Sequence, residues 1–269
     1  MVFSRCLVST TIQRLLALAL PYRCAEVVAA HLARRCLRDP GALLRALHRG
    51  FEAGGGQVRA GESCKVEALC DGPSGGVLLD LAGGRAQDGG REAEFGHVVI
   101  AAGAHSAALA ASVGDSVPLD TERGYHVVFP AGTEQRLTRA VCDPSEGFIM
   151  TPMSGGLRAA GRVELGGVQA PATPGRCDGL ERAAASLFAD ALPSREPWRD
   201  WLGFRPTLPD ALPVIGRSPR DARVVYAFGH QHVGWTLGGI TGQLVAELVA
   251  GEAPSVDIAP FSVERFRWL

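Results

Sequence analysis

The sequence has 269 residues, a formal net charge of −1 at pH 7 and a hydrophobic fraction of 46%. This length and composition indicate a globular chain with room for one large domain or two small ones. They exclude the basic excess of a nucleic-acid-binding protein, and the sequence contains no acidic tail. No apolar run reaches the roughly 18 residues that span a membrane.

Seven cysteines are scattered along the chain without a C-x-x-C pair. Because their number is odd and their spacing irregular, they indicate reduced thiols in an intracellular, cytoplasmic protein. They are Cys6, Cys24, Cys36, Cys64, Cys70, Cys142 and Cys177.

The N-terminal segment, residues 1–38, matches no recognisable pattern. Residues 15–20 are apolar, but the run is short and no clear small-residue cleavage site precedes Cys24. A signal peptide is therefore the weaker alternative.

A helix is predicted from Asp39, which caps its start, with Pro40 in the first turn. Its apolar stripe is expected to be buried, and residues 54–56, all glycine, end it. The stripe consists of Leu43, Leu44, Leu47 and Phe51.

Two strands are predicted next, one containing Val66 and one over residues 77–81, joined by turn residues 71–76. A polar loop then runs to Glu94. A third, buried strand over residues 97–100 leads into small residues, after which Ser106 is expected to cap a helix that buries Leu109 and Val113.

After Pro118 the pattern changes to short apolar segments without intervening helices, which predicts antiparallel pairing in a second domain. Residues 153–156 suit a hairpin turn. Asp178, with Glu181 three residues later, predicts a capping box at the start of a helix that ends near Pro193.

The last regular stretch predicts a buried strand over residues 224–228, a glycine-rich turn, and a helix from Thr241 that stops at Gly251. Such a helix start offers bare N–H groups to an anion. By itself this is a weak signal, since many α/β proteins have such turns.

The order of motifs is more specific. Residues 203–216 read G-F-R-P-T-L-P-D-A-L-P-V-I-G, and residues 229–236 read G-H-Q-H-V-G-W-T. Together they resemble the C-terminal motifs of the D-amino-acid oxidase/dehydrogenase superfamily of FAD enzymes, which includes glycine and sarcosine oxidases. The G-W-T form is most similar to the D-amino-acid dehydrogenases. Residues 122–126 (E-R-G-Y-H) and 98–106 resemble two further motifs of that family.

The resemblance implies a fold that is α/β plus α+β. An incomplete FAD-binding, Rossmann-like domain would comprise residues 39–115 and 206–255, and an antiparallel-sheet substrate domain would comprise residues 116–205. No G-x-G-x-x-G turn, which holds the FAD pyrophosphate in the family, precedes Asp39. The chain thus resembles an N-terminally truncated member, with residues 1–38 unassigned.

FAD is the implied cofactor. In the family, the residue at the position of Val66 contacts the adenine of FAD. The turn at the position of residues 101–106 packs against the ribose and the diphosphate, and the turn at the position of residues 229–236 lies over the flavin. The implied cofactor-binding residues are Val66, Ala101, Ala102, Gly103, Ser106, Gly229, His230, Gly234, Trp235 and Thr236. Trp235 is expected to serve packing rather than chemistry.

The substrate carboxylate needs a fixed partner, and the resemblance assigns it to Arg205, whose planar fork suits a carboxylate. Tyr125 and His232 are further substrate-binding candidates; the alternatives are a core tyrosine bonded to backbone and a solvated histidine. Hydride transfer to a flavin requires no catalytic side chain and no metal. A metal site of His105, His126, His230 and His232 is disfavoured, because no carboxylate or cysteine stands at ligand spacing.

The leading hypothesis is oxidation of the CH–NH bond of a D-amino acid or similar small amino acid. The alternatives are a glycine- or sarcosine-oxidase-like enzyme that uses oxygen, and an inactive truncated fragment or interaction subunit. The expected partners are the amino acid, an electron acceptor or peripheral membrane contact, and a second copy bound through an exposed sheet flank.

Overall fold

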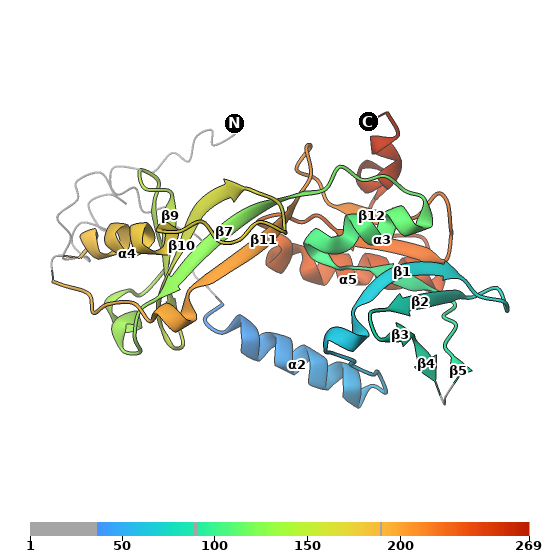
Figure 1. Ribbon diagram of the computed structural model, residues 1–269, viewed down its shortest axis with the longest axis horizontal. Helices are drawn as coiled ribbons and strands as arrows, with labels where there is room; N and C mark the ends of the chain where they lie inside the picture. Colours follow the sequence, from blue (N-terminus) through green and yellow to red (C-terminus); the bar gives the residue numbers. More distant parts are fainter. Residues whose placement is uncertain (1–36, 89–90, 189, 269) are drawn as a thin grey trace. The chain divides into compact units, whose positions relative to one another are not determined.

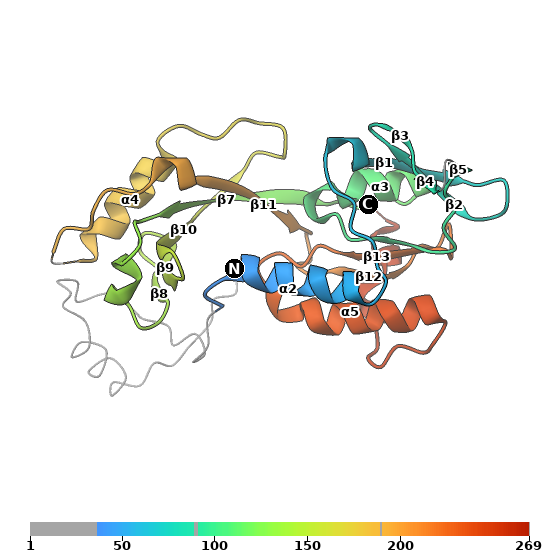
Figure 2. The same ribbon diagram turned by 90° about the horizontal axis from the view of Figure 1, so that it is seen from below.

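The computed structural model describes residues 37–88, 91–188 and 190–268 (Figures 1 and 2), so the expectations for residues 1–36 lie outside the described residues. The chain divides into two compact units. Unit 1 consists of Met1–Gly56, Arg123–Glu164 and Ala170–Gly203, and unit 2 of Gln57–Glu122, Leu165–Gln169 and Phe204–Leu269. The divisions near residues 122 and 203 fall inside two strands.

Unit 1 is built on a five-stranded sheet with the order β11-β7-β10-β9-β8. β8, β9 and β10 pair in antiparallel fashion, as the short apolar segments predicted. The strands are β7 (Asp120–Val128), β8 (Val141–Asp143), β9 (Phe148–Met153), β10 (Gly156–Leu165) and β11 (Trp201–Thr207).

A hairpin turn joins β9 to β10 where it was predicted, since Met153 pairs with Gly156 across two turn residues. Gly156 has a φ of +127°, and a Cβ there would lie 2.0 Å from the backbone oxygen of Phe129. Only glycine allows the two chain segments to approach this closely.

Helix α4 (Arg176–Ser186) lies along one face of this sheet (Figure 1) and buries Leu180 and Ala184 against Phe129 and Met150. The predicted capping box is wrong. The N-cap is Gly175, without a side-chain cap, and Asp178 and Glu181 instead bind Arg195. The carboxylates therefore anchor a following loop and leave the start of the helix uncapped by a side chain.

Helix α2 (Pro40–Ala53) begins as predicted, with Asp39 Oδ1 accepting from the Ala42 N–H at 2.7 Å and Gly54 at its C-cap. Its apolar stripe is not buried, contrary to the prediction. Leu47 and Phe51 are 59% and 58% exposed, and the helix contains no buried residue. The helix groups with unit 1, whereas the sequence placed it in the cofactor-binding half.

Unit 2 contains two three-stranded sheets, ordered β1-β2-β3 and β12-β13-β6, with helices α3 and α5 and a core around Ile100, Val224 and Phe228. Within the predicted polar loop, the short strands β4 (Gln87–Asp88) and β5 (Arg91–Glu92) pair with each other. The other elements are β1 (Val66–Asp71), β2 (Val77–Leu81), β3 (Gly84–Arg85), β6 (Val98–Ile100), α3 (Ser106–Val113), β12 (Val214–Arg217), β13 (Val224–Phe228) and α5 (Gly234–Ala250).

Short 3₁₀ helices link these elements. They are η1 (Glu62–Cys64), η2 (Gly103–His105), η3 (Thr133–Arg136), η4 (Pro197–Arg199), η5 (Ala259–Phe261) and η6 (Val263–Phe266). The last of them contributes Val263 and Phe266 to the core of unit 2.

Helix α5 lies beside β12 and β13 (Figure 2) and begins at Gly234, seven residues before the predicted start. Gly234, Gly238 and Gly239 are therefore helical rather than part of the turn. Packing explains the difference, because Leu244 and Leu248 are buried and offset the cost of the glycines. Gly251 ends the helix with a φ of +76°, as predicted.

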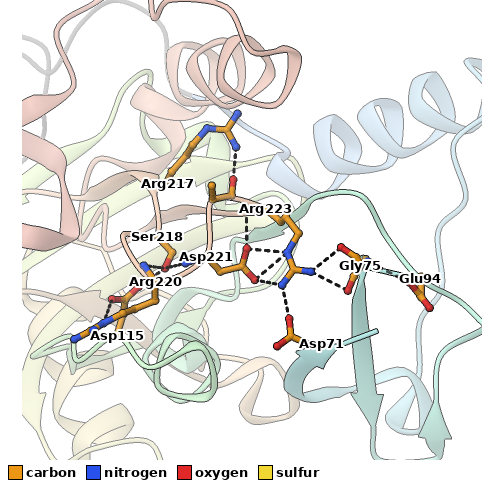
Figure 3. Close-up of polar contacts among 11 residues, drawn as sticks. Asp71, Gly75, Glu94, Asp115, Arg217, Ser218, Arg220, Asp221 and Arg223 are labelled. Atoms are coloured by element: carbon orange, nitrogen blue, oxygen red, sulfur yellow. Dashed lines mark hydrogen bonds and ion pairs between the residues drawn. The ribbon is translucent and has the colours of Figure 1, made fainter. Parts of the chain in front are cut away.

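Arg223 joins the start of β13 to the β1–β2 hairpin (Figure 3). Its guanidinium donates to Asp221, to Asp71 and, at 2.7 and 3.1 Å, to the backbone oxygens of Gly75 and Gly76. These bonds connect segments that are about 150 residues apart in the sequence.

Asp115 is the buried carboxylate next to this cluster (Figure 3). It accepts hydrogen bonds from Ser218 Oγ at 2.5 Å and from Tyr226 OH at 2.8 Å. Burial and the bond to Asp115 raise the pKa of Tyr226. The turn before β13 is therefore tied to the loop that follows α3.

The cysteines in the described part of the chain, Cys64, Cys70, Cys142 and Cys177, form no disulfide. Burial raises the pKa of the Cys177 thiol to about 11, so this side chain stays protonated at neutral pH. None of the described helices combines the length and the apolar character that crossing a bilayer demands.

Candidate functional site

Two glycine-containing segments leave the same edge of a sheet in unit 2. β6 and β13 are parallel neighbours, with Val98 opposite Val224 and Ile100 opposite Tyr226. The carboxyl ends of parallel neighbours lie at one edge, so residues 101–106 and 229–236 emerge there side by side. Ligands of open α/β sheets bind at this kind of edge.

The first segment is open to a ligand. Ala101 and Ala102 are exposed, and Gly103 has a φ of +56° with no described atom within 4 Å of a built Cβ. Ser106 is fully buried, and its Oγ has no hydrogen-bond partner among the described residues. It is the first residue of α3 and not its cap, contrary to the prediction. A buried hydroxyl without a partner suits a bound polar group.

The second segment is held against the end of β11. Gly229 has a φ of +85°, and a Cβ there would lie 2.5 Å from Leu208 Cδ1. Gln231 has a φ of +47° and donates to the Leu208 backbone oxygen at 3.2 Å. A non-glycine residue in this region stores strain, which concentrates at functional sites. The motif comparison did not identify Gln231, because its role depends on this backbone geometry.

The first turn of α5 faces outward. Gly234 begins the helix, Thr236 is exposed, and Trp235 is 62% exposed. Trp235 therefore does not have, among the described residues, the packing role that was expected for it. The N–H groups of the first turn have no acceptor within a helix, so a 17-residue helix presents its positive end here.

Two histidines flank this turn. His230 Nε2 lies 3.0 Å from Thr241 Oγ1, and burial lowers the pKa of His230, which keeps the ring neutral. His232 Nε2 lies 2.9 Å from Glu122 Oε2, with its side chain 54% exposed. Glu122 opens the E-R-G-Y-H motif, but the motif resemblance assigned no role to it.

Arg205 lies in β11, three residues before Leu208. Its Nη1 atom is buried, and no described residue accepts a hydrogen bond from it. A guanidinium is always charged, so a buried N–H without an acceptor favours an anionic ligand.

Val66 begins β1 and is half-buried. β1 forms the outer side of the β1-β2-β3 sheet, so one side of its backbone pairs with no strand of that sheet. The Leu69 N–H donates to Ser112 Oγ of α3 at 3.1 Å, and this bond connects β1 to the helix that follows the first segment.

Tyr125 lies in unit 1, and its hydroxyl is part of a polar network. It donates to Glu164 Oε2 at 2.7 Å and accepts from the Thr173 N–H at 2.9 Å, and its side chain is only 2% exposed. Arg123 lies beside it, with Nη2 at 3.5 Å and a bond of 2.6 Å to the Pro171 oxygen. This arrangement favours the alternative of a structural tyrosine.

We expect Tyr125→Phe to lower the free energy of unfolding by about 1–3 kcal/mol, because the Glu164 carboxylate loses its donor and the Thr173 N–H loses its acceptor. The KM for the amino acid should stay within about twofold. Urea unfolding and steady-state kinetics test both. A large rise in KM with unchanged stability would return Tyr125 to the substrate site.

His126 is held neutral in unit 1. Burial and the charge of Arg158 lower its pKa from the ordinary value of 6.5 to about 4, with Asp200 opposing and Arg199 adding to the shift. Trp201 contacts the ring edge-on, with the ring centroids 5.4 Å apart. Between pH 6.5 and 4 the unfolded chain therefore binds a proton that the folded chain refuses.

The free energy of unfolding should consequently fall by up to about 3 kcal/mol as the pH drops through this window. Above pH 6.5 His126 is neutral in both the folded and the unfolded chain, so this loss of stability is absent there. Replacing His126 with Gln should remove that part of the pH dependence. Urea unfolding of both proteins at several pH values measures the difference. Parallel curves for the two proteins would show that His126 does not cause the slope.

Within the described ranges, no group of three or more His, Cys, Asp and Glu side chains is arranged to hold a metal ion. Among the four histidines weighed for such a site, the structure records a carboxylate contact for His232 and a threonine contact for His230.

The comparisons with known proteins agree with the motif resemblance. The family model described as FAD dependent oxidoreductase matches residues 7–248, which includes most of the N-terminal segment that the motifs left unassigned. A D-amino-acid oxidase of Bradyrhizobium diazoefficiens is 38% identical over 237 residues, covering 87% of this chain and 53% of the relative. A D-amino acid dehydrogenase of Cereibacter sphaeroides is 32% identical over 171 residues, covering 63% and 38%.

Solved structures give the same result. Glycine oxidase from Geobacillus kaustophilus matches with a TM-score of 0.61 and 31% identity, covering 74% of this chain and 51% of that one. Iminodiacetate oxidase from Chelativorans sp. BNC1 matches in fold, with a TM-score of 0.66 and 22% identity over 82% and 57%. The chain spans about half the length of the proteins that it matches.

Proposed function

The chain belongs to the family of FAD-dependent oxidoreductases, and from this premise we propose that it oxidises the bond between the α-carbon and the amino nitrogen of a D-amino acid. FAD is the cofactor that family membership implies. The relatives named D-amino-acid oxidase and D-amino acid dehydrogenase support the substrate class.

The residues at the shared sheet edge fit FAD. Ser106 offers a buried hydroxyl without a partner, and Gly103 leaves open space where a side chain would block approach. The positive end of α5 would stabilise an anionic or electron-rich group bound at this edge. When bound there, FAD supplies the two-electron acceptor for the hydride of the α-carbon.

The proposal depends mainly on Arg205. Its buried Nη1 without an acceptor is the observation that most directly indicates an anionic ligand, and a substrate carboxylate satisfies it. Two parallel N–H groups hold both carboxylate oxygens and thereby fix the direction in which the α-hydrogen points. His232 with Glu122 and the neutral His230 line the neighbouring turn, where they contact the substrate or order water.

The test is the colour of the purified chain. We expect it to take up FAD with the absorption bands of a bound flavin, and to bleach when D-alanine is added without oxygen. Reoxidation by oxygen or only by an added dye then identifies the electron acceptor. A colourless protein that does not bind added FAD would support the alternative of an inactive fragment or interaction subunit.

A further inference from the structure

Unit 1 contains a cavity of about 300 Å³ that the proposed function does not use. Its lining residues come from the start of α2, the β9–β10 hairpin, β7, β10 and η4. The Ser154 N–H donates to the Arg38 backbone oxygen at 3.0 Å, which holds the start of α2 against the hairpin. We call it the arginine cavity, because Arg38, Arg158 and Arg199 line it.

Most charges around the arginine cavity already have partners. Asp39 Oδ1 caps α2 through the Ala42 N–H at 2.7 Å, and this carboxylate is the acidic group in the lining. Arg199 Nη1 donates to the Gly155 oxygen at 2.9 Å and to Glu196 at 2.7 Å. His126 is neutral at physiological pH. Three arginines and one aspartate line the cavity, so the formal charge of the lining is positive.

Arg158 differs from Asp39 and Arg199 in this respect. Its Nε atom is buried, and it donates to no acceptor in the part of the chain that the structure describes. Burial also lowers the pKa of Arg158, although an arginine stays charged at any physiological pH. A buried guanidinium whose Nε has no acceptor is a poorly compensated positive charge, and an anion held in the cavity by the Nη groups of Arg158 would offset it.

We propose that the arginine cavity binds a small carboxylate through the guanidinium of Arg158. The two Nη groups of a guanidinium present parallel N–H groups that match the two oxygens of a carboxylate. Val128 and Met153 give the cavity an apolar wall, so a short alkyl chain attached to the carboxylate fits. The site is separate from the one proposed for the substrate, since Arg205 is not part of the lining.

Calorimetric titration of the full chain with sodium butyrate, at ionic strength held constant with sodium chloride, tests the proposal. We expect saturable binding that Arg158→Gln weakens by about tenfold or more. Arg182→Gln, which removes an exposed arginine of α4, is the matched control and should leave the affinity unchanged. Arg205→Lys should also retain this binding, which separates it from the substrate site.

A second measurement does not depend on the folding of a variant. Phenylglyoxal modifies accessible arginines, and butyrate should slow the modification of Arg158 more than that of Arg182, as measured by peptide mass spectrometry. Equal butyrate affinity in the wild type and Arg158→Gln, no saturable binding, or modification of Arg158 that butyrate does not slow would each overturn the proposal.

Discussion

Replacing Arg205 with Lys should raise the KM for a D-amino acid on the order of 10²-fold or more, with a smaller change in kcat. A lysine keeps the charge but loses the planar fork, so only one hydrogen bond to the carboxylate remains. About 3 kcal/mol of binding corresponds to this change. Initial-rate kinetics over a range of amino-acid concentrations measure it.

Arg182→Lys is the control for that experiment, because Arg182 is exposed on α4 and should leave the kinetics unchanged. The thermal midpoint of both variants should match the wild type within a few degrees. A KM within about twofold of the wild-type value would remove Arg205 from the substrate site and would leave the proposed function without its main support.

Gly156→Ala should destabilise unit 1 by at least about 3 kcal/mol or prevent it from folding. The new Cβ would lie 2.0 Å from the Phe129 oxygen and 3.0 Å from the Pro130 oxygen. Both are backbone atoms, so no side-chain rotation can relieve the overlap. Phe129 is fully buried, and its N–H donates to the Leu157 oxygen at 2.8 Å, so the strand cannot retreat without losing core packing.

The neighbouring Gly155→Ala is the matched control. Its Cβ would meet only the flexible Arg199 Nη2 at 3.4 Å, and its φ lies outside the left-handed region. Its free energy of unfolding should stay within about 0.5 kcal/mol of the wild type. Urea unfolding followed by tryptophan fluorescence compares the two variants. Similar losses in both would mean that the backbone at residue 156 can adjust.

Local signals predicted several elements correctly. The apolar run of β13 has the bounds expected from the sequence, Asp39 caps α2, and the hairpin turn falls at residues 153–156. In each case the information lies within a few adjacent residues. The parallel pairing of β6 with β13 follows from the strand–turn–helix order, which is also visible in the sequence.

The failures have non-local causes. The start of α5 was misplaced because three glycines indicated a turn, whereas packing of the buried Leu244 stabilises the helix around them. Asp178 and Glu181 have the spacing of a capping box, but Arg195, on the loop after α4, binds both. The stripe of α2 has helical periodicity, and nothing in its sequence indicates whether another segment covers it.

The same distinction applies to the candidate site. The segments at residues 101–106 and 229–236 were identified because their motifs are contiguous. Glu122 and Gln231 were not, since their roles depend on His232 and on Leu208, which are distant in the sequence. The network around Tyr125 likewise joins residues 39 and 48 positions apart, which sequence spacing does not reveal.

Arg223 and Gly75 are 148 residues apart, and β13 completes the sheet that β6 begins. A ribosome adds roughly 5–20 residues per second, so the interval between the synthesis of β6 and that of β13 lasts from seconds to tens of seconds. During that interval β6, whose Val99 is still 40% exposed in the final fold, lacks β13, its neighbour in the described sheet. We expect nascent chains to depend on chaperones most strongly between the synthesis of β6 and that of β13.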